Sequence, residues 1–404
     1  MTMETKLKIL VLTQVFPNSA MPHRGSFISE RVRLLSESAD IRVINPVPYC
    51  PPVPGLGRYS RLARVGLRGE TPEGCLVTHP RYFVPPKVAT FVQGYAMSHA
   101  VRRHLAADTW RPDAIDAHFA FPDGYAAVRL GQSLGCPAIV TCHGTDLSLY
   151  PRLILTGRMM HWTMRHAARV IGVAPHLRDK AIELGCTPAH ALMLPNGVDC
   201  DMFTLLNRLQ CRTELNLPID RPVALCIGSL DDNKNQAVLI EALALLKTDR
   251  KPMHLVLVGT GRLRATLEKL ADRLLVAPDV TLAGPRPYAE IPTWLGASDW
   301  LVLASRREGW PSVYFEAMAC GRPVITSGVA AARYAIDRGD LGTVVAPNTP
   351  HAWALALDRA RQIKWNPQAI RLHAMNHSWS HWACSYLALV HEVLGRHQYT
   401  GVAA

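Results

Sequence analysis

Short apolar segments alternate with helix-forming segments along both halves of the chain, and this alternation constrains the fold more than any other feature. Buried-strand patterns occur at Lys6–Thr13, Ala114–His118 and Ala138–Cys142, and again at Val223–Ile227 and His254–Val258. Helix-forming stretches separate them. Strands that alternate with helices form parallel sheets with both faces covered. A chain of 404 residues is long enough for two such domains.

The predicted fold class is therefore α/β, with two Rossmann-like, doubly wound domains that face each other across a cleft. The predicted boundaries are 1–196 for the N-terminal, acceptor-side domain and 197–377 for the C-terminal, donor-binding domain. Residues 378–404 are expected to form a helix that crosses back to the first domain, because apolar residues recur in it at helical spacing.

The stretch 304–324 is the most informative one for function, because two carboxylates, Glu308 and Glu316, flank a predicted turn and the start of a helix. The turn is 309–311, and Ser312 is predicted to cap the helix. A strand that leads through a turn into a helix N-terminus is typical of an anion site. Carboxylates accept hydrogen bonds from hydroxyl groups, so the ligand should carry both phosphate and hydroxyl groups, as a sugar nucleotide does.

Two histidines, His118 and His143, end or follow successive predicted strands of the first half. The carboxyl ends of parallel strands face the ligand crevice, so both histidines are candidates for chemistry, and His143 is the stronger one.

Arg24-Gly25 precedes a predicted helix at a position typical of phosphate contact, although one glycine is a weaker signal than GxGxxG. Because GxGxxG is absent, a nicotinamide dehydrogenase is disfavoured.

Composition excludes several other classes. No apolar run reaches the length of a membrane-spanning helix, and the short N-terminal run fits a strand better than a signal peptide. The ten cysteines show no zinc-ligand spacing and are predicted to be reduced core thiols of a cytoplasmic protein. His373, His377 and His381 lack an acidic or cysteine partner, so a solvated face is predicted there rather than a metal site.

The formal net charge is +12, and residues 1–196 carry 22 Lys and Arg against 13 Asp and Glu, a net +9. An anionic membrane, an anionic acceptor, nucleic acid or a merely basic surface would each fit this excess. We expect peripheral contact with the inner face of the cytoplasmic membrane and no nucleic-acid partner. Arginines between 58 and 68 interleave with leucine and valine, which predicts either a basic amphipathic segment or a solvated loop.

Taken together, these motifs resemble the retaining family 4 glycosyltransferases, which have the GT-B fold. The resemblance extends from Lys6 to about Leu394. It rests on REGWPSVYFEAMACGRPV around the two glutamates, HGTDL at 143–147, LPNGVD before the second domain and LVGTG after a strand. The segments TQVFPNSAMPHRGSFISERVRLL and AHFAFPDGYAAV are similar to members that build cell-surface polysaccharides and exopolysaccharides.

The resemblance implies a role for each residue of the site. Glu308 would hold hydroxyls of the transferred sugar, Glu316 would bind the ribose, and Lys234 would pair with the diphosphate. His143 and Glu308 are the implied catalytic residues. The implied donor-binding residues are Gly25, Ser229, Lys234, Gly309, Trp310, Pro311, Ser312, Val313 and Glu316, with His118, Asn196, Gly259, Arg24 and Arg262 as additional candidates.

No metal and no cofactor are implied, because Lys234 and helix N-termini would replace the charge of a metal ion. The chain departs from the family pattern five residues before the lysine, where Ser229 replaces the usual arginine. Arg262 and Arg24 are candidate substitutes. The sequence VAAAR at 329–333 also replaces the usual glycine pair and acidic residue.

The predicted activity is metal-independent transfer, with retention, of a sugar from a nucleotide-diphosphate donor to a glycan or lipid-linked acceptor. Polysaccharide or cell-envelope glycan synthesis is the expected process. Two alternatives stay open. One is a GT-B protein that binds sugar nucleotides but is catalytically impaired, suggested by Ser229, and the other is a nucleotide-sugar epimerase. The sequence leaves the donor base, the sugar and the acceptor undetermined.

Overall fold

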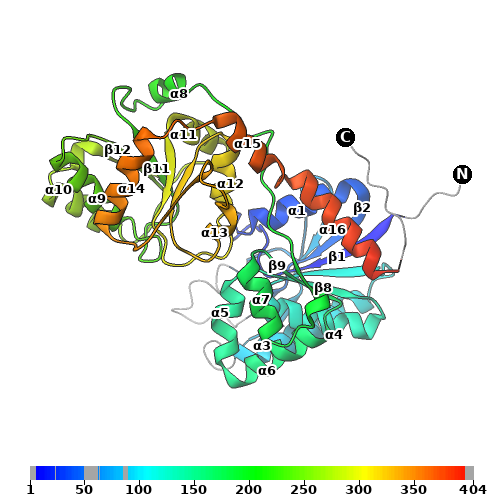
Figure 1. Cartoon of the computed structure of the whole chain (residues 1–404). Helices are drawn as coiled ribbons and strands as arrows, with labels where there is room; N and C mark the ends of the chain where they lie inside the picture. The colour runs from blue at the N-terminus through cyan, green and yellow to red at the C-terminus, as the bar shows by residue number, and fades with distance from the viewer. Residues whose placement is uncertain (1–5, 23, 50–61, 63, 85–89, 396–404) are drawn as a thin grey trace, which may run out of the picture. The chain divides into compact units, whose positions relative to one another are not determined.

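The computed structural model describes residues 6–22, 24–49, 62, 64–84 and 90–395. The chain divides into two compact units (Figure 1). The first comprises the chain up to Asn196 together with the stretch from Ser380 onward, and the second comprises Gly197–Trp379. Each unit has its own sheet and is described by itself.

The first unit is built on an eight-stranded sheet in the order β10-β9-β8-β7-β1-β2-β5-β4, parallel except for the β4–β5 pair. Its central strands are buried along nearly their whole length, as expected where helices cover both faces. A separate parallel pair joins β3 and β6. The strands are β1 (Leu7–Leu12), β2 (Ala39–Ile44), β3 (Val47–Tyr49), β4 (Arg68–Glu70), β5 (Leu76–Thr78), β6 (Arg81–Phe83), β7 (Ala114–His118), β8 (Ala138–Cys142), β9 (Arg169–Gly172) and β10 (Ala191–Met193).

The helices of the first unit follow the strands in the alternating pattern of a doubly wound fold. They are α1 (Ser26–Ser38), α3 (Thr90–Ala106), α4 (Tyr125–Leu134), α5 (Thr145–Leu149), α6 (Ile154–His166) and α7 (Pro175–Glu183). The C-terminal α16 (Trp379–Val393) packs on α1, since the guanidinium of Arg31 lies 4.5 Å above the ring of Trp382.

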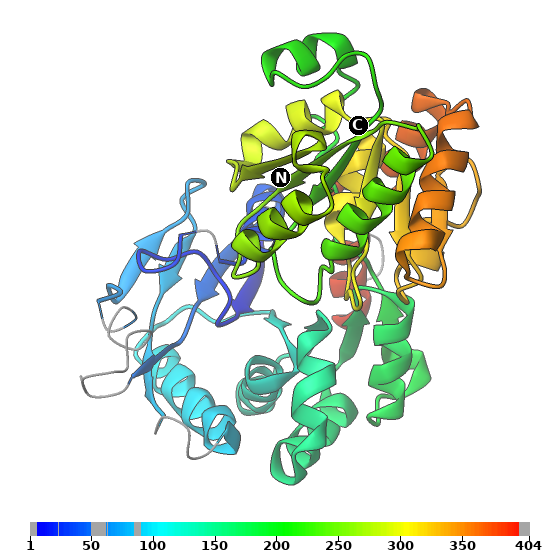
Figure 2. The same ribbon diagram turned by 90° about the vertical axis from the view of Figure 1, so that its left-hand side faces the viewer.

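The second unit contains a six-stranded, fully parallel sheet in the order β13-β12-β11-β14-β15-β16 (Figure 2). The strands are β11 (Val223–Ile227), β12 (His254–Val258), β13 (Val280–Gly284), β14 (Trp300–Leu303), β15 (Val324–Ser327) and β16 (Gly342–Val345). The helices are α8 (Arg208–Glu214), α9 (Ala237–Thr248), α10 (Arg264–Arg273), α11 (Ile291–Ala297), α12 (Ser312–Ala319), α13 (Ala332–Ala335), α14 (Pro350–Gln362) and α15 (Pro367–Met375).

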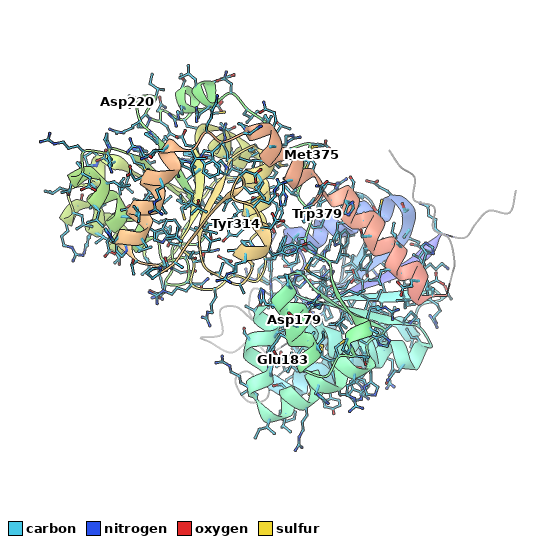
Figure 3. All side chains as sticks on the ribbon, in the orientation of Figure 1. Asp179, Glu183, Asp220, Tyr314, Met375 and Trp379 are labelled. Atoms are coloured by element: carbon cyan, nitrogen blue, oxygen red, sulfur yellow. The ribbon has the colours of Figure 1, made fainter. Side chains whose placement is uncertain are left out.

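One large hydrophobic core fills the second unit, from β11 and β14 to the helices on both sides of the sheet. The core fixes α12, because Tyr314 is fully buried and its hydroxyl is hydrogen-bonded to the Oγ1 of Thr326 on β15 (Figure 3). The helix that carries Glu316 is therefore held against the sheet.

The irregular segment predicted between residues 48 and 86 contains the short strands β3, β4, β5 and β6, wholly or in part. Each has three residues, too few to produce a periodic pattern, and each is fixed by pairing with another strand. The proposed basic amphipathic segment falls mostly outside the described residues, and its last arginine, Arg68, begins β4. In the described part of the chain, no helix has both the length and the apolar character needed to cross a bilayer.

Candidate functional site

A lysine–glutamate ion pair joins the loops that follow two neighbouring strands of the second unit. Lys234 lies in the loop after β11, and Glu308 lies in the loop after the adjacent β14. The Nζ of Lys234 is 2.6 Å from the Oε1 of Glu308, and the two side chains are only 18% and 12% exposed. The two charged groups that the resemblance assigns to diphosphate and sugar are thus in direct contact.

Backbone contacts hold these two loops together. The N–H of Arg306 donates to the carbonyl of Asn233 (2.7 Å), and the Nδ2 of Asn233 donates to the carbonyl of Arg307 (3.0 Å). Asp231 shapes the first loop, because its Oδ1 accepts the N–H groups of Asn233 and Lys234, both at 3.0 Å. The position of Lys234 therefore does not depend on Glu308 alone.

Ser229, which stands where the family has arginine, donates its hydroxyl to the Oδ2 of Asp231 at 2.6 Å. This hydrogen bond is the largest cause of the lowered pKa of Asp231. The candidate substitute Arg262 forms an exposed ion pair with Asp232 of the same loop. Arg262 is therefore at the edge of the phosphate-side loop, with its charge already balanced.

Two glycines allow the phosphate-side loops to approach closely. Gly228 has φ +154°, and a Cβ there would lie 3.1 Å from the Cε of Lys234. Gly259 has φ +142°, and a Cβ there would lie 2.0 Å from the carbonyl oxygen of Gly228. A side chain at either position would displace the lysine or separate the loops.

The helix α12 begins immediately after the turn that follows Glu308. Pro311 occupies the N-cap position and Ser312 is the first helical residue, so the predicted cap by Ser312 is wrong. Since no side chain caps this helix, its positive N-terminal end is left for another acceptor. The turn is anchored by Trp310, whose ring stacks on Phe315 at 4.9 Å, and Val313 packs against the core.

Glu316 lies in the second turn of α12. Its Oε1 accepts a hydrogen bond from the hydroxyl of Tyr288 at 3.2 Å. Burial of the carboxyl raises the pKa of Glu316 to about 7. The group therefore changes protonation near neutral pH, and a ligand hydroxyl that donates to it favours the ionised form.

The predicted solvated histidine face is wrong for two of its three members. The ring of His377 lies 4.5 Å from that of Phe315, and the ring of His373 lies 5.4 Å from that of His377. The reason is that α15, which contains His373 and ends two residues before His377, packs on α12, which carries Phe315. His381 is exposed on α16. Among the described residues, no group of three or more His, Cys, Asp or Glu side chains is placed to hold a metal ion.

In the first unit, the two candidate histidines are in contact. The Nδ1 of His118 lies 3.2 Å from the Nε2 of His143. The ring of His143 also lies between those of Phe27 and Phe119, at 5.0 and 4.7 Å. Burial lowers the pKa of both histidines, that of His143 strongly, so both imidazoles are neutral at neutral pH.

A buried carboxylate lies beside this histidine pair and influences which ring nitrogens carry protons. The Oδ2 of Asp116 lies 3.3 Å from the Nε2 of His118, and the pKa of Asp116 is lowered although burial opposes its ionisation. A carboxylate favours N–H at Nε2 of His118, which leaves Nδ1 as an acceptor. His143 then donates from Nε2 and keeps the lone pair of its Nδ1, which can accept a hydrogen bond from a hydroxyl group.

Arg31 supplies the positive charge of the same buried cluster. It is 1% exposed, donates to the Oδ1 of Asn196 at 2.8 Å and lies 3.5 Å from the Oγ1 of Thr141. Asn196, an additional candidate, thus holds Arg31. Asp116 and Arg31 were not expected from the sequence, although Asp116 is two residues before His118 on one strand and so shares its face.

The remaining candidates of the first unit, Arg24 and Gly25, lie between β1 and α1, and Asp146 in α5 fixes the loop after β8. Gly25 has φ +74° at the start of α1, where a Cβ would lie 2.2 Å from the carbonyl oxygen of Val15. Arg24 donates to the sulfur of Met21 at 3.9 Å. Asp146 of the HGTDL motif is buried and accepts the N–H groups of Ala120 and Gly144, both at 2.8 Å, which fixes the loop of His143.

Comparison with known proteins identifies the class to which this fold and site belong. Among solved structures, sucrose-phosphate synthase from Thermosynechococcus elongatus superposes with a TM-score of 0.75 at 18% identity, covering 96% of this chain and 99% of that one. HepE of Anabaena in complex with UDP gives 0.72 at 17% identity, covering 96% and 100%. The predicted α/β GT-B fold is confirmed.

Sequence comparison gives the family. The model of glycosyl transferases group 1 matches residues 208–371, and that of Glycosyltransferase Family 4 matches 36–202. A D-inositol 3-phosphate glycosyltransferase of Thermobispora bispora is 30% identical over 78% of this chain and 77% of its own length. A Bacillus subtilis protein provisionally named a teichuronic acid biosynthesis glycosyltransferase, TuaC, is 29% identical over 90% and 91%. The chain belongs to the group 1 and family 4 glycosyltransferases and is a glycosyltransferase.

Proposed function

We propose that this glycosyltransferase moves a sugar, with retention and without a metal ion, from a nucleotide-diphosphate donor to a glycan or lipid-linked acceptor. The observation that carries the proposal is the contact of Lys234 with Glu308 beside the uncapped start of α12. A cation and a helix N-terminus suit a diphosphate, and a neighbouring carboxylate suits sugar hydroxyls.

The chemistry requires charge stabilisation where the leaving group departs. The bond between the anomeric carbon and the diphosphate oxygen breaks, and the diphosphate keeps the electron pair. The acceptor oxygen bonds to that carbon on the same face, and its proton passes to the departing phosphate. We assign to Lys234 the stabilisation of the negative charge on the leaving diphosphate. Glu308 would bind the sugar hydroxyls and Glu316 the ribose. His143, in the first unit, would have a catalytic role through contact with the transferred sugar.

Relatives and structural neighbours support the donor class and the process. HepE, which shares the fold, is found with UDP and with UDP-glucose. The name of TuaC refers to teichuronic acid biosynthesis. We propose polysaccharide or cell-envelope glycan synthesis for this chain on that basis, with a cytoplasmic location. A thermal-shift screen of UDP, GDP, ADP and their sugar derivatives tests the donor class, because a ligand of the folded state raises the melting temperature.

A second candidate function is a sugar-nucleotide-binding protein without turnover. The observation that favours it is the engagement of the Ser229 hydroxyl by Asp231, which leaves Lys234 without the second cation of the family pattern. Incubation of the identified donor with a matched cell extract separates the two functions. Formation of any glycosylated product excludes the binding protein, and binding without product excludes the transferase.

We also propose peripheral contact of the first unit with an anionic membrane surface. Leu153, Ile154 and Leu155 are exposed at the start of α6, with the exposed Arg152 and Arg158 on either side. Such a basic, apolar patch suits an anionic bilayer. In vesicle sedimentation we expect preference for anionic over neutral lipid.

The matched variants are Ile154→Glu and, as the control, Ile219→Glu, since Ile219 is similarly exposed but belongs to the second unit. Binding to anionic vesicles should fall in the first variant and persist in the control. Equal binding of the unmodified chain to neutral and anionic vesicles contradicts membrane contact.

A further inference from the structure

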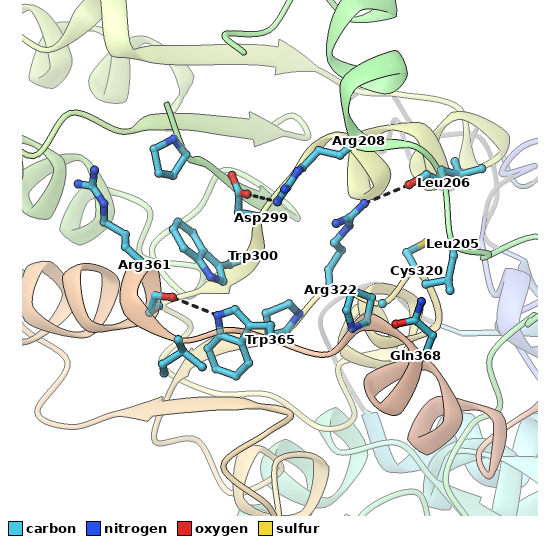
Figure 4. Close-up of a pocket in the computed structure, with 16 residues that line it drawn as sticks. Leu205, Leu206, Arg208, Asp299, Trp300, Cys320, Arg322, Arg361, Trp365 and Gln368 are labelled. Carbon is cyan, nitrogen blue, oxygen red and sulfur yellow. Dashed lines mark hydrogen bonds and ion pairs between the residues drawn. The ribbon is translucent and has the colours of Figure 1, made fainter. Parts of the chain in front are cut away.

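Figure 4 shows the residues that line a hollow of about 720 Å³ in the second unit. The hollow lies at the end of the sheet opposite to Lys234 and Glu308. Pro222, Trp300 and Pro323 line it, and these residues stand at the amino ends of β11, β14 and β15. The loops with Lys234 and Glu308 follow the carboxyl ends of strands in the same sheet. The hollow is therefore separate from the donor site, and its volume is typical of small-molecule sites.

Positive charge is in excess in this hollow. Arg208, Arg322 and Arg361 line it, against one acidic side chain, Asp299. Asp299 is already shared, because it pairs with Arg208 and, at 2.5 Å, with Arg212. Within the described residues, no carboxylate pairs with Arg322 or Arg361. The Asp299 charge therefore does not neutralise the hollow.

Three nitrogens of the lining residues have no hydrogen-bond acceptor among the described residues. They are the Nε1 of Trp300, the Nε of Arg322 and the Nη1 of Arg361, and all three are buried. Trp300 is 3% exposed and Arg322 is 8% exposed. Buried donors are normally satisfied. Burial, and then the nearby charge of Arg208, lower the pKa of Arg322, so an anion there would relieve an existing penalty.

Aromatic rings and polar groups complete the lining. Trp365 is fixed by its Nε1, which donates to the carbonyl of Ala360 at 3.1 Å. Its ring is partly exposed and offers indole surface to a ring of mixed polarity. Gln368 and Asp299 provide acceptors for hydroxyl groups. A ligand that matches all of these features has a negative group, hydroxyls and a compact ring.

We propose that this hollow is a second binding site, which takes a small anionic saccharide through its carboxylate or phosphate group. Guanidinium groups bind both anions through paired N–H donors. Arg361 and Arg322 would hold the anionic group, and Trp365 would contact the sugar ring. The site lies apart from the donor site, so its occupant is a ligand other than the donor.

Titration calorimetry and thermal shift of the full chain with glucuronate and with glucose 6-phosphate test the proposal, with glucose as the neutral control. The informative variants are Arg361→Gln and, as the matched control, Arg359→Gln, which removes the same charge from an exposed position of the same last turn of α14. Lys234→Met serves to exclude binding at the donor site.

We expect at least one of the two anionic sugars to raise the melting temperature of the unmodified chain, of Arg359→Gln and of Lys234→Met. The dissociation constant should be about tenfold higher in Arg361→Gln, the loss expected for one charge-assisted contact. Any of four results would overturn the proposal. Two concern the variants: equal dissociation constants for the Arg361 and Arg359 variants, or loss of binding in Lys234→Met. The other two are a rise in melting temperature with glucose, or with inorganic phosphate, equal to that with the anionic sugars.

Discussion

The Nζ of Lys234 lies 2.6 Å from the Oε1 of Glu308, and this contact joins the loops after two adjacent parallel strands. Each group balances the charge of the other. A donor that brings a diphosphate and sugar hydroxyls offers each of them a new partner. The pair is thus both a structural link and the feature on which the proposed activity depends.

The energetic link between the two side chains is testable without substrate. Lys234→Met should lower the free energy of unfolding by about 1–3 kcal/mol, because it leaves the largely buried Glu308 carboxylate without its partner. The double variant Lys234→Met/Glu308→Gln should recover part of this loss. Chemical denaturation of the unmodified chain, the two single variants Lys234→Met and Glu308→Gln, and the double variant gives the coupling energy. Strict additivity of the two single changes argues against a stabilising contact.

Restoring the family arginine tests how the diphosphate is neutralised. Ser229→Arg should increase kcat/KM for the donor about tenfold or more, because it adds a second cation beside Lys234. Ser229→Gln is the control for side-chain length. Steady-state kinetics with the identified donor decide the point. If kcat/KM of the Ser229→Arg variant is no higher than that of Ser229→Gln, another group of the native protein already supplies that charge.

The raised pKa of Glu316 predicts a pH dependence of donor binding. Ribose hydroxyls donate to the ionised carboxylate, so the dissociation constant of the nucleotide should decrease as pH rises from 6 to 8, across the pKa of about 7. Calorimetry over this range measures the effect. The dependence should largely disappear in Glu316→Gln, and an unchanged pH profile in that variant would assign the titration to a different group.

The same carboxyl also predicts a pH dependence of stability. Glu316 retains its proton in the folded chain at pH values where the unfolded chain has lost it. Its contribution to the free energy of unfolding should therefore decrease as pH rises from about 4.5 to about 7. Denaturation of the unmodified chain and of Glu316→Gln should differ most at the upper end of this window. Parallel stability curves for the two proteins would contradict the pKa shift.

Asp116 should act on turnover through the histidine pair. Asp116→Asn weakens the preference for N–H at Nε2 of His118, so the tautomer of His143 is no longer fixed, and kcat should fall by about ten- to a hundredfold. The donor KM should change little. Nitrogen-15 NMR of the imidazoles reports the tautomers directly. Asp179→Asn, at an exposed position of α7, is the control. If the tautomers of His118 and His143 are unchanged in Asp116→Asn, Asp116 does not position the histidine pair.

Local sequence patterns were sufficient for the regular elements of the fold. The bounds of β7, β8, β11 and β12 were predicted to the residue, because each is a short apolar run bounded by turn or loop residues. The short strands β3, β4, β5 and β6 were not predictable in this way, since three residues carry no periodic pattern and pairing with other strands stabilises them. The same limit applies to His377, whose packing on Phe315 depends on where α15 ends.

The candidate site shows the same division. The motifs around Glu308 and Lys234 predicted a shared site, and the structure places both residues in loops that follow adjacent strands. The partners of those residues lie far away in sequence: Lys234 is 74 residues from Glu308, and Arg31 is 165 residues from Asn196. Periodicity carries no information about such contacts, so the charge balance of the site required the structure.

The most direct test of sugar transfer at this site is proton NMR of a reaction that contains the identified donor and an acceptor from a matched extract. The unmodified chain should release the nucleoside diphosphate and form a new anomeric signal with the configuration of the donor, and chelation of metal ions should not stop the reaction. Glu308→Ala should stay folded and form no product. Full transfer by Glu308→Ala, or inversion of the anomeric configuration, would contradict the account.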